Sequence, residues 1–145
     1  MSGEPITEPI RALSQALFQA LAPVVETYKG LPAYYWLASP AELDADAALG
    51  RGDLTGLIIA QLQGPVAAGG WIGEGTATGP LAVRCIATSD DAAQALAADA
   101  VAALSTGVSI TGYRLTLAYT GELVIPPLGG RYTAAPRYDA EIRRI

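Results

Sequence analysis

The chain has 145 residues, of which 51% are hydrophobic and 16% are charged, and its formal net charge is −5. It contains no histidine and a single cysteine, which excludes Ser-His-Asp catalysis and zinc sites built on Cys or His side chains. An acidic chain with one lysine also lacks the clustered cations that general nucleic-acid binding needs.

The length predicts a single domain over residues 1–145. The charged fraction lies below the usual share of about 25%. Two explanations stand: an alanine-rich composition, or a subunit whose surface is largely covered by neighbours. Cys85 cannot form an internal disulfide, and no stretch approaches the length of a membrane span or the pattern of a signal peptide. We therefore expect a protein made and kept in the cytosol, or in an assembly built there.

The first element in the chain is an amphipathic helix over about 8–28. Thr7 supplies a capping hydroxyl, and apolar residues then recur at three- and four-residue steps as far as Tyr28. Pro23 lies inside this stripe and predicts a kink or break near Ala22, because proline lacks the N–H that a helix interior requires.

Three strands are expected next, separated by two loops. The strands are 33–39, 54–63 and 80–88, the last of which contains Cys85. We expect an acidic loop over 40–53, either open or with one helical turn over 41–49, and a glycine-rich loop or loose hairpin over 66–79.

The strand over 80–88 leads into a helix, so that 80–105 forms a strand–helix unit. Ser89 is the expected cap, and Asp90 and Asp91 in the first turn favour the positive end of the helix dipole. The helix over 89–105 is rich in alanine, which permits close packing on a sheet. Its expected buried face consists of Ala93, Leu96, Ala97, Ala100, Val101 and Leu104.

The final segment, 112–145, alternates apolar and polar residues and predicts two antiparallel strands. A turn, PPLGG, is expected over 126–130, and Pro136 predicts a bulge or an edge position. The fold class is therefore α+β: a mostly antiparallel sheet of about four to five strands, with the N-terminal helix and the Ala-rich helix packed on one face.

Short motifs provide little support for catalysis. The glycines of 73–79 precede a strand rather than a helix, so they do not match a dinucleotide fingerprint. Arg51-Gly52-Asp53 matches an adhesion tripeptide at a length where chance matches are common. The acidic pairs are better explained by solvation or by the helix dipole than by acid–base catalysis. These pairs are Asp44/Asp46 and Asp90/Asp91.

The order of elements resembles the tail terminator (tail completion) family of long-tailed bacteriophages and of phage-like gene-transfer particles. The likeness lies in the opening helix, in LAVRCIATSDDAAQALAADAVAAL (81–104) and in GRYTAAPRYDAEIRRI (130–145), where an arginine–aromatic pair precedes an alternating run. The 66–79 loop and the PPLGG turn have no counterpart in the family pattern.

The resemblance implies a non-enzymatic virion protein of the tail–neck region, assembled in the host cytoplasm without a cofactor. Copies would form a ring, usually of six, that caps the tail tube, stops its polymerisation and meets the head connector, while DNA passes through the lumen. Its partners would be itself, the tail tube protein and a head-closure or connector protein, with no membrane. The candidate contact regions are the loops 40–53 and 66–79 and the terminal strand. The candidate interface residues are Trp71, Arg131, Tyr132, Arg137, Arg143 and Arg144.

Other functions stay open. The chain could be another neck component such as a head-closure ring subunit, a tail tube subunit, or part of a secretion or injection apparatus. A different class is a small cytosolic enzyme or ligand-binding domain acting through carboxylates and tyrosines, which would require a concave pocket.

Overall fold

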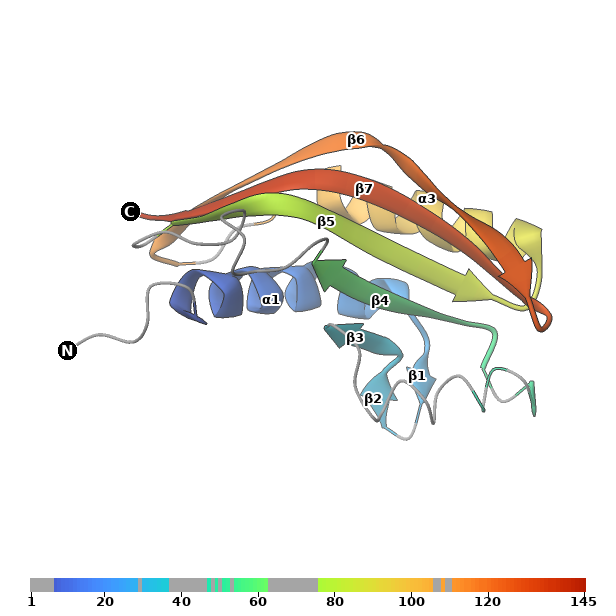
Figure 1. Ribbon diagram of the computed structural model, residues 1–145. Coiled ribbons are helices and arrows are strands. Elements are labelled where there is room, and N and C mark those ends of the chain that lie inside the picture. The colour runs from blue at the N-terminus through green and yellow to red at the C-terminus, as the bar shows by residue number, and fades with distance from the viewer. Residues whose placement is uncertain are drawn as a thin grey trace.

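The computed structural model describes residues 7–28, 30–36, 47, 49, 51–52, 54–62, 76–105, 108 and 111–145. They form two layers, a twisted sheet and a layer of helices on one of its faces (Figure 1). The helices are α1 (Thr7–Leu21), the short 3-10 helix η1 (Ala22–Val24) and α3 (Asp90–Ser105). The strands are β1 (Thr27–Tyr28), β2 (Leu31–Pro32), β3 (Tyr34–Trp36), β4 (Gly56–Leu62), β5 (Thr76–Ala87), β6 (Tyr113–Leu128) and β7 (Arg131–Arg144).

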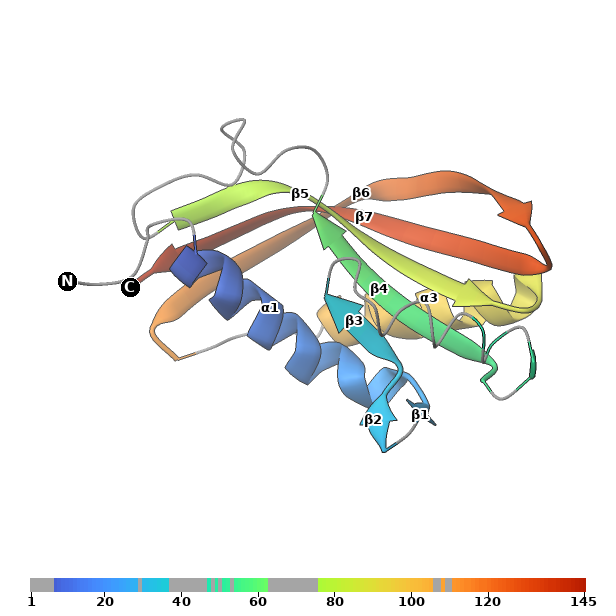
Figure 2. The ribbon, with the colours of Figure 1, turned by 60° about the horizontal axis from the view of Figure 1, so that its bottom comes forward.

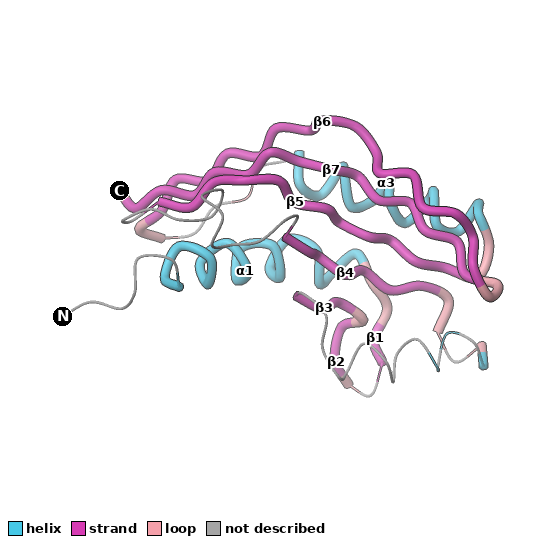
Figure 3. The backbone as a smooth tube through the Cα atoms, in the orientation of Figure 1, coloured by secondary structure: helices cyan, strands magenta, loops and turns pink. Residues whose placement is uncertain are grey.

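The main sheet has five strands in the order β3-β4-β5-β7-β6, and β1 and β2 form a separate antiparallel pair. All neighbours in the main sheet are antiparallel except β3 and β4, which run parallel. Figure 3 shows how β5, β7 and β6 curve together as long strands over the helices. The predicted α+β class, with a mostly antiparallel sheet and two main helices on one face, is confirmed, and the β1–β2 pair is an addition to it.

Helix α1 is shorter than predicted. It ends at Leu21, and Pro23 lies in the 3-10 turn that follows, so the break predicted near Ala22 is confirmed. The extension to Tyr28 is wrong, because Thr27 and Tyr28 belong to strand β1. The apolar stripe continued past the break, but a helix hydrogen-bond ladder cannot pass a proline without losing a bond.

The main core lies between the sheet and the two helices. Leu13, Leu17 and Leu21 of α1 are fully buried there, as are Ile58, Leu81 and Ile142 of the sheet. From α3 the core receives Ala93, Ala97, Ala100 and Leu104, while the predicted Leu96 and Val101 are only partly buried. Ser89 caps α3 as predicted, because its Oγ accepts a hydrogen bond from the Ala92 N–H at 3.2 Å.

A second, smaller cluster lies on the opposite face of the sheet, at its β3–β4 end. It consists of Ala33, Leu49, Leu54, Leu57 and Ile59. Strand β4 is therefore buried on both faces, which explains the near-continuous apolar run of 57–60. None of the described helices lies over the rest of this face, which is formed by β5, β7 and β6 (Figure 2).

Several predicted boundaries are corrected by the sheet. Thr76–Gly79 belong to β5 rather than to a loop, while 66–75 and most of 40–53 lie outside the described residues. In PPLGG only Gly129 and Gly130 turn, both at positive φ, and the prolines continue β6. Pro136 lies in β7, an interior strand, so the edge position is wrong. The β5–β7 pairing is interrupted at residues 135 and 136, and the register shift of β6 between Tyr119 and Gly121 lies opposite the adjacent Arg137, so the irregularity expected near Pro136 is present.

Candidate assembly surface

The open sheet face is the side of β5, β7 and β6 turned away from the helices. In β7 the odd-numbered residues face this way, because the even-numbered Ala134, Tyr138, Ala140 and Ile142 belong to the core. The residues of β5 and β6 that pair with these odd-numbered residues of β7 lie on the same face of the sheet. The charged members of the open sheet face are Arg84, Arg114, Arg131, Arg137, Arg143, Asp139 and Glu141. Five arginines against two acids make this face basic on an acidic chain.

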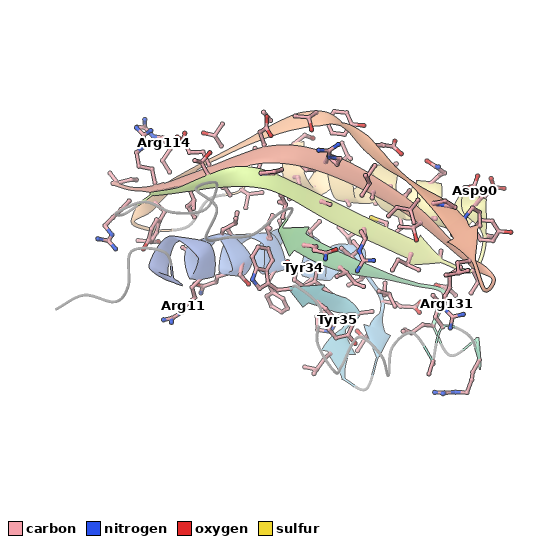
Figure 4. All side chains as sticks on the ribbon, in the orientation of Figure 1. Arg11, Tyr34, Tyr35, Asp90, Arg114 and Arg131 are labelled. Carbon is pink, nitrogen blue, oxygen red and sulfur yellow. The ribbon has the colours of Figure 1, made fainter. Side chains whose placement is uncertain are left out.

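Two arginines are direct neighbours at one end of the open sheet face. Arg114 of β6 lies opposite Arg143 of β7 in the register, and like charges placed directly opposite repel. Arg143 donates to the Glu141 carboxylate at 3.0 Å, in a pair that is well exposed. Such an exposed pair contributes little stability. Arg114 projects above the sheet in Figure 4 and has no ion-pair partner within the described part of the chain.

Arg137 occupies the middle of the open sheet face. Its Nε is buried and has no hydrogen-bond partner among the described residues. Arg137 pairs with Ala82 of β5, and Ala135 lies two residues before it on the same face of β7. Both alanines are completely buried. A buried arginine nitrogen without an acceptor is uncommon in a finished interface, because each such group carries a desolvation cost.

Strand β6 forms the free edge of the sheet beside this face. It is 16 residues long, and it exposes Tyr119 at 52% and Leu128 at 82%. A register shift at Tyr119/Gly121 and the two prolines 126 and 127 interrupt its outer row of backbone groups. Bulges and prolines of this kind protect an edge against uncontrolled strand addition.

The opposite side of the molecule carries acidic groups along α3. Asp90, Asp91 and Asp99 are exposed on this helix, which has no basic residue. Two open grooves flank it. One of about 320 Å³ contains Glu26 and Asp99, and the other, of about 340 Å³, contains Glu122. Glu26 accepts hydrogen bonds from the N–H and the hydroxyl of Thr55 at 2.6 and 2.8 Å, which fixes one groove wall.

An aromatic groove of about 490 Å³ lies between α1 and β3. Phe18, Tyr34, Tyr35 and Trp36 line it, with Arg11 at the same groove. Phe18 and Tyr34 meet edge to face with ring centroids 5.9 Å apart. Tyr34 is 7% exposed and its hydroxyl oxygen is buried without a partner among the described residues. Burial raises the pKa of this tyrosine, so the phenol stays neutral.

We expect Tyr34→Phe to leave the protein at least as stable, with a gain of up to about 1–3 kcal/mol in the free energy of unfolding, because it removes an unsatisfied buried hydroxyl and retains the ring. Urea denaturation followed by tryptophan fluorescence measures this. Tyr34→Ala is the contrast, expected to cost about 3–5 kcal/mol through the cavity it leaves. A loss above about 1 kcal/mol for Tyr34→Phe would mean that the hydroxyl is satisfied.

The six predicted interface residues do not share one face. Arg131, Arg137 and Arg143 lie on the open sheet face, and Arg131 also donates from Nη1 to the Gly129 carbonyl at 2.9 Å. Tyr132 packs against the main core and Arg144 lies on the helix side of β7. Trp71 is outside the described residues.

Sequence analysis missed two parts of this surface. Arg114 was readable from its alternation with Tyr113 and Leu115, which marks it as the opposite face of β6. The second part is Asp99, which lies beyond the first turn of α3; the sequence analysis explained only Asp90 and Asp91, by the helix dipole.

Neither the comparison with protein-family models nor the comparison with curated proteins found a match for this chain. No helix within the described ranges is long and apolar enough to cross a membrane. What the fold and surface define is an α+β protein with a basic open sheet face and an acidic helix face.

Proposed function

We propose that this chain is a structural subunit that assembles into a ring, as a tail terminator does at the end of a phage tail tube. The observation that carries the proposal is the β6–β7 hairpin: none of the described helices covers its outer face, and β6 pairs with no further strand among the described residues. A face of this size with partly buried apolar residues such as Leu123 and Ile125 provides a contact surface for other protein chains.

The order of elements also supports the proposal. The opening helix, the strand that leads into the Ser89-capped alanine helix and the two long terminal strands are the elements on which the resemblance to tail terminators rests. The two sides of the layered fold differ in chemistry, as a ring built by head-to-tail contacts requires. In this proposal one ring surface fits the tube end, the other refuses a further tube ring, and the subunit belongs to the tail–neck region of a virion assembled in the host cytoplasm.

Electron microscopy of the purified chain, together with light scattering after size exclusion, tests the proposal. We expect closed rings of about six subunits, because head-to-tail contacts close when the rotation between copies divides the circle. Rings mixed with a polymerising tube protein should stop tube growth. Monomers that persist at high concentration would contradict ring formation, and rings that leave tube length unchanged would contradict the terminator role.

The terminal strand is one of the candidate contact regions, but deletion of 131–145 is not an informative test of its role in ring formation. Strand β7 lies between β5 and β6, so removing it opens the centre of the sheet and exposes the core residues Tyr138, Ala140 and Ile142. The loss of rings would then follow from unfolding. Substitutions confined to exposed side chains separate folding from assembly.

A further inference from the structure

We infer that the partner of the open sheet face is a second copy of this chain, which docks there through the acidic outer face of α3. This inference rests on the proposed ring, because it identifies the surfaces that join neighbouring copies. The two surfaces lie on opposite sides of one subunit: α3 packs on the helix side of β5 and β7, while the arginines point the other way. One contact therefore leaves both a free basic face and a free acidic face, and the contact can repeat.

The basic surface contains cations that its own chain does not satisfy. Arg114 is exposed without an ion-pair partner within the described ranges, and the register places it against Arg143. Arg137 has a buried Nε without an acceptor among the described residues. A carboxylate from another chain relieves the repulsion between Arg114 and Arg143, because it separates like charges and offers the paired acceptors that a guanidinium fork binds.

The acidic surface is shaped for close approach. The outer side of α3 exposes the alanines 95, 98 and 102 between its aspartates, so no long side chain holds a flat partner away. Glu122 and Glu26 stand in the grooves on either side of the helix. This gives five carboxylates around a helix that lacks any basic residue.

The two surfaces also agree in length. A helix of 16 residues such as α3 is about 24 Å long. Arg137 and Arg143 are six residues apart on β7, a separation of about 20 Å along an extended strand. A helix laid along the hairpin therefore spans both arginines, with Asp90 and Asp91 in its first turn and Asp99 about 13 Å further along its axis. Charge complementarity of this kind selects orientation and register between copies.

The test uses two full-length variants that reverse one surface each. Arg114→Glu/Arg137→Glu leaves three arginines against four acids, so the sheet face becomes acidic. Asp91→Lys/Asp99→Lys/Glu122→Lys leaves two carboxylates against three lysines, so the α3 face becomes basic. Each variant alone presents like charges on its two faces, so we expect its self-association constant to fall at least about tenfold. Mixed in equal amounts, they present opposite charges at both alternating contacts, and assemblies should reappear that contain the two in equal number. Native mass spectrometry distinguishes the two subunits by mass.

The control is a charge reversal outside both surfaces. Arg11→Glu reverses an exposed arginine on α1, away from both surfaces, and should assemble like the unmodified chain. Circular dichroism melts verify that each variant folds; if the Arg137 change unfolds the chain, Arg114→Glu/Arg143→Glu replaces it, because Arg143 is well exposed and the sheet face again becomes acidic. Assembly of the unmodified chain should also weaken with salt. Variants that each assemble normally would overturn this contact and leave the proposed ring standing. Monomers of the unmodified chain at every concentration would overturn both.

Discussion

Leu17→Ala is expected to lower the free energy of unfolding by about 2–5 kcal/mol, a large share of the total for a domain of this size. Leu17 has no exposed surface and lies in the main core, where α1 meets the sheet. Alanine leaves a cavity that the surrounding strands cannot fill, because β5 and β7 are fixed by neighbours on both sides. Urea denaturation followed by circular dichroism gives the change in midpoint.

Gln19→Ala is the matched control on the same helix, since Gln19 is exposed and alanine is the best helix former. It should change the free energy of unfolding by less than about 0.5 kcal/mol. If Leu17→Ala lowered the free energy of unfolding as little as the control does, α1 would not pack in the core.

Stability is expected to fall steeply as the pH rises from about 9 to about 12. Burial, aided by the charge of Glu122, raises the pKa of Cys85 from 9.0 to about 12. Burial, followed by Tyr119 and Cys85, raises the pKa of Tyr138 to about 12, and burial also raises that of Tyr34. The unfolded chain releases these protons at lower pH than the folded chain, so stability is fully present below the ordinary values and declines above them.

The slope for one fully buried group reaches at most about 1.4 kcal/mol per pH unit. Urea midpoints measured from pH 6 to pH 11 test this. The curve should be flat near neutrality because the chain has no histidine. Tyr138→Phe and Cys85→Ala each remove one titrating group and should reduce the alkaline slope, whatever they do to stability at pH 7. An unchanged slope in both variants would assign the alkaline loss to other groups.

Local chemistry explains why some elements were predictable. Ser89, two first-turn aspartates and repeated alanines specify α3 without help from the rest of the chain, and its start was found to the residue. The alternation in 131–144 placed Arg131, Arg137 and Arg143 together, because side chains two apart share a face of a strand. Tyr132 and Arg144 were grouped with them by proximity in sequence, and the same period sends them to the opposite face.

Other features depend on contacts between distant segments. Nothing within 31–36 indicates that β3 runs parallel to β4, a pairing secured by the Ile58 N–H donating to the Ala33 carbonyl at 3.0 Å. Because Pro136 cannot donate a ladder hydrogen bond, the sequence predicts an edge or a bulge there; the pairing with β5 is interrupted at this residue, but the strand lies in the interior of the sheet. A local pattern cannot give a strand's neighbours.

The sequence by itself determined the α+β class, the capped alanine helix, the break at Pro23 and the absence of histidine chemistry. These follow from residue counts, hydrogen-bonding capacity and periodicity, which act over a few neighbouring residues. Only the tertiary structure decided that β7 lies inside the sheet, that five arginines share the face opposite the helices and that the acids of α3 lie on the other side. The physical reason is that strand order and layer packing bring together residues from distant parts of the chain, and burial of the whole core, rather than any local preference, selects that arrangement.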